Sequence, residues 1–363
     1  MRYSSIDLLR TLAIFVMVFV HFCENLAGYS PKFAGLGAPL FMFLSGISFR
    51  LWLNGQLTRG IADTTISKIT VRRGLFLFGV GFAFNILVWL PEDVFNWDVL
   101  TLIGSGIIAL NFARRAPVMI TLLFCAMVIL ISPSARAVAD WPAFWTQGYF
   151  DPDLTLTDVI QGYLVVGYFP VLPWIVVPLL GFVTATLVFG TSREQLPNQR
   201  VLLTGFLIGM AMVVLAAAAI ATRYFSPQLF PTTWPKAWTM FPPSCEYLLA
   251  TIGFALSSFC GSYRWLDQSA SPTRFSGLKK FGAAFSRHSF TAYILHHLAH
   301  LWPLWIYAIA TGHEPTQFWR KATTVPIAVL LATVFLVCCW LLFRWMDRFR
   351  VPGVESWMRW VCD

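Results

Sequence analysis

Apolar stretches long enough to cross a lipid bilayer recur along the whole chain, and this feature constrains the fold more than any other. A membrane-spanning helix needs about 20 predominantly apolar residues, because the hydrocarbon core is roughly 30 Å thick. Of the 363 residues, 57% are hydrophobic and only 12% are charged, whereas a soluble domain carries about 25% charged residues. We therefore expect an all-α polytopic membrane protein, with residues 1–363 forming a single integral-membrane domain.

The hydropathy pattern predicts about ten transmembrane helices. In the sixth, Gly167 and three prolines favour a short re-entrant piece followed by a full span. In the seventh, Gly205 and Gly209 have the small-xxx-small spacing that lets two helices pack closely. The predicted ranges are 5–27, 34–53, 74–91, 98–113, 117–132, 159–189, 201–222, 245–260, 288–310 and 323–343.

The basic residues predict the orientation of the chain in the membrane. If both termini are cytoplasmic, all but six of the 26 Lys and Arg residues fall in cytoplasmic segments. The six exceptions are Lys32, Arg136, Arg223, Lys236, Arg320 and Lys321. This bias favours cytoplasmic N- and C-termini and an even number of helices. The net charge of +9 therefore reflects topology and contact with anionic lipid, and we expect no nucleic-acid partner.

Arg10 and His21 are the ionisable residues of the first predicted helix that most suggest function. Their separation of eleven positions is close to three helical turns, so both share one face, roughly 16 Å apart along the axis. An ionisable side chain within a membrane segment is costly and by default suggests a functional site. The alternative is that Arg10 is a cytoplasmic anchor and His21 a polar residue near the far interface.

Two carboxylates lie one turn from these residues. Asp7 could pair with Arg10, which would lower the cost of holding both near the membrane. Glu24 could orient His21 and raise its basicity, which suits a general base. The other reading of Glu24 is a side chain that faces water.

The ninth predicted helix carries a second polar stripe. Ser289, Tyr293, His296 and His300 are spaced i, i+4, i+7 and i+11, so they share a face and suggest a polar cavity. Tyr293 and His296 are candidates to donate hydrogen bonds to a developing oxyanion. The His296–His300 spacing also suits a zinc ligand pair. Because neither a Glu directly after His296 nor an acidic third ligand is nearby, we expect no metal.

Lys68, Arg72 and Arg73 lead into the third predicted helix. Anchoring at the cytoplasmic interface would by itself explain them. The functional alternative is a cradle for phosphate groups, since arginines bind phosphate bidentately.

Four stretches resemble the transmembrane acyltransferase superfamily, which includes the acyltransferase-3 proteins and the heparan-α-glucosaminide N-acetyltransferase-like bacterial membrane proteins. The first is the opening Ser5-Ile-Asp-Leu-Leu-Arg10 that runs on to His21, an arginine and a histidine with ten residues between them. The other three resemble the bacterial members on the heparan N-acetyltransferase side. They are 38–46 (APLFMFLSG), 168–174 (YFPVLPW) and 286–293 (SRHSFTAY) with His296.

This resemblance implies a membrane-embedded acyltransferase that moves an acyl group, usually acetyl, from cytoplasmic acyl-CoA to a sugar hydroxyl or amine at the outer face. His21 matches the catalytic histidine, as general base or transient acyl carrier, and Arg10 matches the motif arginine. Arg72 and Arg73 lie where the acyltransferase-3 group has an Arg-x-x-Arg pair. Here the pattern is Lys68-x-x-x-Arg72-Arg73, a departure that bears on their part in donor binding.

The expected partners are acetyl-CoA or another acyl-CoA, a glycan or amino-sugar acceptor and the lipid bilayer, with homo-oligomer formation left open. The expected location is the bacterial cytoplasmic (inner) membrane. A rival function is a secondary transporter of a small anion or sugar that uses intramembrane His and Arg residues. It predicts repeat symmetry between the halves, which we do not find in the sequence. A non-catalytic scaffold would leave Arg10 and His21 replaceable.

Overall fold

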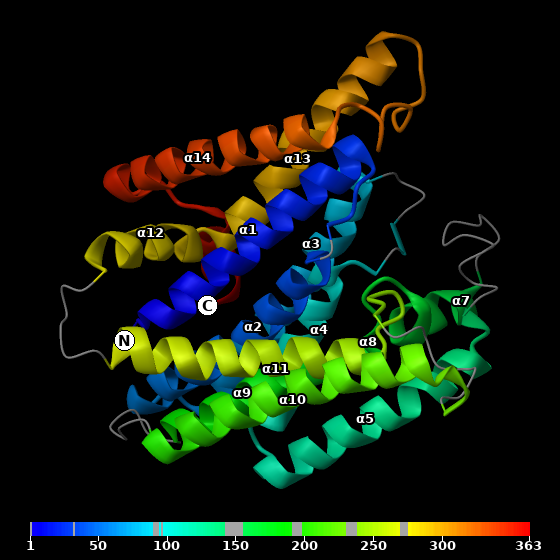
Figure 1. Ribbon diagram of the computed structural model, residues 1–363. Helices are drawn as coiled ribbons and strands as arrows, with labels where there is room; N and C mark the ends of the chain where they lie inside the picture. Colours follow the sequence, from blue (N-terminus) through cyan, green and yellow to red (C-terminus); the bar gives the residue numbers. More distant parts are fainter. Residues whose placement is uncertain are drawn as a thin grey trace. The chain divides into compact units, whose positions relative to one another are not determined.

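The computed structural model describes residues 2–31, 33–89, 94–95, 97–141, 155–190, 198–229, 238–268 and 275–363 (Figure 1). Helices are the regular secondary structure of these ranges, which confirms the predicted all-α class. The longer helices are α1 (Ser4–Ala27), α2 (Gly37–Thr58), α3 (Asp63–Val88), α4 (Val99–Ala113), α5 (Val118–Val138), α9 (Val176–Phe189), α10 (Gln199–Phe225), α11 (Cys245–Ser262), α12 (Ser276–Arg287), α13 (Ser289–Ala310) and α14 (Val325–Phe349). The shorter ones are η1 (Ala34–Leu36), α7 (Leu156–Gln161), η3 (Gly162–Val166), α8 (Val171–Trp174), η4 (Pro227–Leu229), η5 (Tyr263–Asp267) and α15 (Val354–Cys362).

Within the described residues, seven helical segments are long and apolar enough to cross a membrane, which supports a multi-pass membrane protein. A helix lies within each of the ten predicted stretches, but α4, α11 and α13 fall outside these seven. About ten spans and cytoplasmic termini therefore stay predictions. The seven segments are Ser4–Ala27, Ala34–Thr58, Asp63–Val88, Val118–Val138, Leu156–Phe189, Gln199–Phe225 and Val325–Phe349.

Several helix boundaries differ from the predictions because hydropathy does not register polar helical turns. The helix predicted from residue 74 begins at Asp63, so the basic residues Lys68, Arg72 and Arg73 lie within α3 and not before it. The amphipathic helices α12 and α15 were not predicted, because they have only 12 and 9 residues and carry charged side chains, so a search for long apolar runs does not detect them. The predicted break in the stretch 159–189 is confirmed, since α7, η3, α8 and α9 follow one another there.

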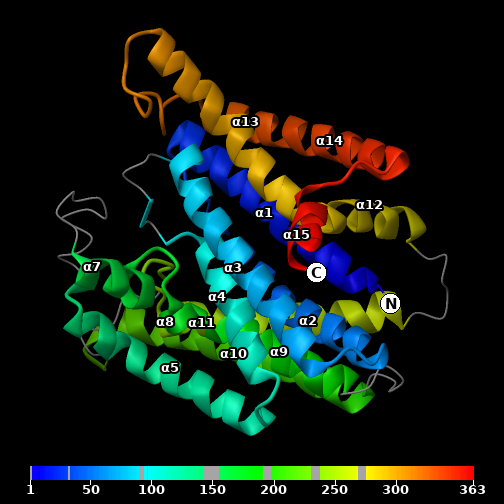
Figure 2. The ribbon, with the colours of Figure 1, turned by 180° about the vertical axis from the view of Figure 1, so that it is seen from behind.

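The chain forms two compact units, and the unit that holds both ends of the sequence contains residues 1–41 and 262–361. In this unit α1 packs against α12, α13 and α14 (Figures 1 and 2). Ile14, Val18 and Phe22 of α1 meet Phe285 and Phe343 in its apolar core. The interpretation of residues 1–363 as one domain stays a prediction.

α1 ends where Gly28 takes a left-handed backbone conformation, with φ of 65°. A Cβ atom at Gly28 would lie 2.8 Å from the carbonyl oxygen of Arg320. The segment after α13 also bonds to the end of α1, since the Arg320 N–H donates to the Asn25 carbonyl at 2.7 Å. Gly28 therefore ends this helix and, because it has no side chain, leaves room for the backbone at Arg320.

The second unit holds residues 42–261 together with Cys362 and Asp363. In it α3 packs against α4, and α9 packs against α4, α5 and α10. The close packing predicted for the Gly205–Gly209 motif is confirmed on α10. A Cβ at Gly209 would lie 2.7 Å from the Gly253 carbonyl oxygen of α11, so the two backbones approach within the range that only small residues permit.

Gly46 and Gly181 allow a similar approach between α2 and α9. A Cβ at Gly46 would overlap the Pro178 carbonyl oxygen and lie 2.7 Å from the Phe182 nitrogen. The neighbouring atoms belong to backbone and cannot rotate away. The stretch 38–46 singled out in the sequence therefore ends at a glycine with a packing role.

We predict that Gly46→Ala destabilises the protein, because the added methyl group must push two helix backbones apart. Overpacking of this kind costs about 1–3 kcal/mol. Thermal unfolding in detergent, followed by tryptophan fluorescence, measures the change. Gly79→Ala is the matched control, since Gly79 is also inside a helix but has open space around it. It should unfold at the wild-type temperature or slightly above, and equal losses in both variants would contradict the packing argument.

Candidate active site

A row of hydrogen bonds joins α1 to the segment formed by α12 and α13. Arg10 Nη1 donates to Ser286 Oγ at 2.9 Å. Further along, His21 Nδ1 lies 2.8 Å from His296 Nε2, and Asn25 Nδ2 donates to His300 Nε2 at 2.8 Å. The paired residues are separated in sequence by 276, 275 and 275 positions. Because these offsets differ by only one residue, the two segments run parallel and nearly in register.

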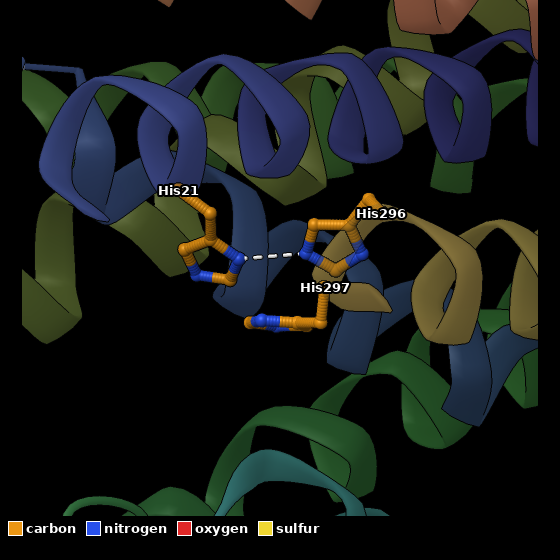
Figure 3. Close-up of side chains that lie close together, drawn as sticks. All are labelled: His21, His296 and His297. Atoms are coloured by element: carbon orange, nitrogen blue, oxygen red, sulfur yellow. Dashed lines mark hydrogen bonds between the residues drawn. The ribbon is translucent and has the colours of Figure 1, made fainter. Parts of the chain in front are cut away.

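His21, His296 and His297 form a cluster, which we call the histidine cluster (Figure 3). The rings of His21 and His296 lie edge to edge, with their planes 15° and their centroids 5.1 Å apart, and the His297 ring centroid lies 4.7 Å from that of His21 and 3.9 Å from that of His296. His296 and His297 are 0% and 1% exposed. The structure thus brings together the two histidines that the sequence singled out and adds a third.

The hydrogen bonds of His296 determine which nitrogen of His21 carries a proton. His296 Nδ1 lies 3.3 Å from the Ala292 carbonyl oxygen, which can only accept, so Nδ1 is the protonated nitrogen. In a neutral ring His296 Nε2 is then an acceptor, and His21 Nδ1 is the donor in the 2.8 Å bond. This leaves a lone pair on His21 Nε2.

Tyr293 contributes its ring to the same cluster. It is buried, and its ring centroid lies 5.5 Å from His296 and 5.6 Å from His297, edge-on to both.

Glu24 is half-buried, and Arg320 is the basic residue whose charge acts on it. Among the hydrogen bonds of the described residues, His21 is joined to His296 and not to Glu24.

Asp7 and Arg10 find different partners from the pairing expected within α1. Asp7 accepts from Arg2 Nε at 2.6 Å, whereas Arg10 binds Ser286. The carboxylates of Asp7 and Glu355 both act on the Arg10 charge. The arginine of the motif is therefore held among polar groups of its own unit.

The three basic residues expected to bind phosphate belong to α3, in the other unit. Lys68 and Arg72 are exposed. Arg73 donates to both carboxylate oxygens of Asp363, at 2.9 and 2.7 Å, and its guanidinium lies 4.9 Å from the Trp52 ring centroid. Arg73 thus already has an anionic partner within the protein.

The chain was compared with known proteins. Residues 2–202 match the family described as heparan-alpha-glucosaminide N-acetyltransferase, catalytic. The match covers more than half of the chain and includes Arg10 and His21. The chain belongs to this family. No curated protein matched the sequence.

Membership supports a membrane acetyltransferase, since this is an acetyltransferase family. The matched range ends before α13, so His296, His297 and Tyr293 lie outside it. Only the folded structure connects these residues with His21. His297 is not part of the polar stripe predicted from the sequence, because its position does not fit the i, i+4, i+7 spacing.

Glu355 is a further residue near the candidate site that the sequence did not indicate. Its Oε1 accepts from the backbone N–H groups of Phe290 and Thr291 at 2.6 and 2.9 Å, and its Oε2 accepts from Thr291 Oγ1 at 2.8 Å. Val354 N donates to Thr291 Oγ1 at 3.0 Å. The start of α15 therefore satisfies the free N–H groups at the start of α13, the helix that carries the cluster. Because α15 was not predicted from the sequence, no local pattern indicated that Glu355 would bond to the start of α13.

We predict that Glu355→Ala lowers stability by about 1.5–3 kcal/mol, the typical value for hydrogen bonds to a charged group. The N–H groups of Phe290 and Thr291 would lose their acceptor. The apparent unfolding temperature in detergent should fall clearly below that of wild type. Glu314→Ala removes an exposed carboxylate from the loop after α13 and should leave that temperature unchanged. Equal behaviour of the two variants would contradict the role of Glu355.

Proposed function

We propose that the protein transfers an acetyl group from cytoplasmic acetyl-CoA to a sugar hydroxyl or amine at the extracytoplasmic face of a bacterial inner membrane. The observation that carries this proposal is the His21–His296 hydrogen bond within a buried cluster of a chain from an acetyltransferase family. It leaves His21 with a lone pair on Nε2, and such a nitrogen can accept a proton from an attacking hydroxyl or amine.

In the proposed reaction the acceptor oxygen or nitrogen attacks the thioester carbonyl of acetyl-CoA. His21 Nε2 takes the proton of the acceptor as the new bond to the acetyl carbon forms. The carbon–sulfur bond then breaks, and the departing CoA thiolate receives the proton from His21. The same lone pair could instead take the acetyl group first, giving an acetyl-histidine intermediate and ping-pong kinetics.

The neighbours of His21 then have distinct parts. We assign His296 to positioning, because both of its ring nitrogens are already engaged, one by the Ala292 carbonyl and one by His21. The hydroxyl of Tyr293 is the candidate oxyanion donor, since its ring packs against the cluster. Glu24 remains a candidate for tuning the charge around His21 from one turn away.

For the donor, Arg10, Lys68, Arg72 and Arg73 are our candidates to bind the phosphate groups of CoA. Lys68 and Arg72 are exposed and can meet a phosphate directly. Arg73 would have to exchange the Asp363 carboxylate for phosphate. We propose no resident metal for the transfer itself.

The test is transfer of labelled acetyl from acetyl-CoA by the purified protein in liposomes, with glucosamine and simple glycans as acceptors. We predict that His21→Ala lowers transfer by about 10²–10⁴-fold, the usual contribution of general acid–base catalysis. His313→Ala is the control, because His313 is exposed in the loop after α13. Wild-type activity in His21→Ala would refute the proposal, and uptake that does not depend on acyl-CoA would point to a transporter.

A second prediction separates positioning by His296 from a purely structural role. His296→Ala removes the acceptor for His21 Nδ1–H, so kcat should fall on the order of tenfold, with little change in KM. His296→Gln keeps a side-chain acceptor and should recover part of that loss. Steady-state kinetics over a range of pH measure both variants. If alanine and glutamine lowered kcat equally and shifted KM with it, His296 would not act by orienting His21.

A further inference from the structure

The histidine cluster has a second chemical capacity, because three imidazoles converge on one point (Figure 3). One ring nitrogen each from His21, His296 and His297 can be chosen so that all three lie within 4.8 Å of one another. Among the residues that the structure describes, this is the group of three His, Cys, Asp or Glu side chains whose donor atoms come together in this way.

The spacing is close to what a tetrahedral metal site needs. Zinc binds imidazole nitrogen at about 2.0–2.1 Å, which places two ligand nitrogens roughly 3.4 Å apart. His21 Nδ1 and His296 Nε2 are now 2.8 Å apart and share a proton. A small opening of this pair and a small approach of His297 would bring the three nitrogens to the required separation. Three histidines with a fourth position open are a ligand set used by zinc.

The surroundings of the cluster also suit a metal site. A ligating histidine usually donates its other N–H to a carbonyl or carboxylate, which fixes the ring. His296 Nδ1 meets the Ala292 carbonyl in this way at 3.3 Å. His300, in contrast, bonds to Asn25 and to the His296 carbonyl, and lies outside the group of three. The candidate ligands therefore differ from the His296–His300 pair suggested by sequence spacing.

The chemistry of the donors limits which ions fit. The three ligands are imidazoles, which suit Zn²⁺, Cu²⁺ and Ni²⁺, whereas Mg²⁺ and Ca²⁺ prefer oxygen ligands. Two ligands are adjacent on one helix, and the third comes from a helix held in register by the bonds from Arg10 and Asn25. The site is thus largely formed before any ion arrives.

We propose that His21, His296 and His297 bind a divalent transition-metal ion of the zinc class, which replaces the proton shared by His21 Nδ1 and His296 Nε2. The displaced proton passes to Nε2 of His21, so the ring stays neutral. A metal-bound His21 then has no free lone pair. If the proposed function holds, the metal-bound protein cannot take the acceptor proton, and zinc inhibits acetyl transfer reversibly.

Binding is tested without reference to activity. The purified protein in detergent is stripped with a chelator and titrated with Co²⁺, whose visible absorption reports four-coordinate geometry, and Zn²⁺ is then added to displace it. We expect one equivalent to bind. His297→Gln should lose on the order of a hundredfold in affinity or more, since even loss of an outer partner costs 10–100-fold. His313→Gln, at an exposed histidine outside the cluster, is the matched control and should retain wild-type affinity.

Absence of the absorption band in wild-type protein would overturn the proposal, and this result needs no variant to fold. Equal affinity in wild type and His297→Gln would overturn it as well. Transfer assays with added Zn²⁺ form a separate arm. Metal binding without any transferase activity would uphold the site and refute the proposed function, whereas activity without binding would do the reverse.

Discussion

The parallel alignment of α1 with α12 and α13 is the interaction on which the candidate site depends. It rests on hydrogen bonds with sequence offsets of 276, 275 and 275, from Arg10 to Ser286, from His21 to His296 and from Asn25 to His300. A polar group without a partner is costly in an apolar surrounding, so each of these bonds also penalises a shifted register. The apolar contacts of Ile14, Val18 and Phe22 lie between the polar ones and hold the same alignment. Packing and polar pairing thus select one arrangement.

Within that alignment a buried partner fixes the tautomer of a histidine, as in a catalytic triad, but the partner here is a neutral imidazole and not a carboxylate. In a Ser-His-Asp triad a buried carboxylate fixes the tautomer of the histidine and stabilises its protonated form. Here the neutral ring of His296 fixes the tautomer of His21 through one hydrogen bond. A neutral partner avoids the desolvation of a buried carboxylate, but it stabilises an imidazolium less. Such an arrangement suits a base that holds a proton briefly and passes it to a thiolate.

The sequence predicted the parts of this structure that depend on local pattern. Helix periodicity placed Arg10 and His21 on one face of α1, and the glycines of α10 predicted a close helix contact that Gly209 makes. Long-range pairing could not be predicted from the sequence, because no local pattern indicates which polar residues will come into contact. Asp7 thus pairs with Arg2 rather than Arg10, and His297 joins the cluster from a position that helical spacing had set aside.

The hydropathy pattern also failed to predict the short polar helices. α12 and α15 have only 12 and 9 residues and carry charged side chains, so they do not register as apolar spans, yet Ser286 and Glu355 within them bond to Arg10 and to the start of α13. The first turns of α3 were missed for the same reason. The segments that support the candidate site are therefore the ones that a search for apolar runs is least able to find.

The sequence separation of the paired residues also has a consequence for biosynthesis. His21 and His296 are 275 positions apart, which at about 5–20 residues per second amounts to roughly 14–55 s of translation. During that interval α1 lacks the partners of Arg10, His21 and Asn25. Ionisable side chains within a membrane segment are costly when they lack partners, so α1 relies on its own apolar residues until α13 has been made. α1 therefore gains these polar partners only after α12 and α13 have been synthesised.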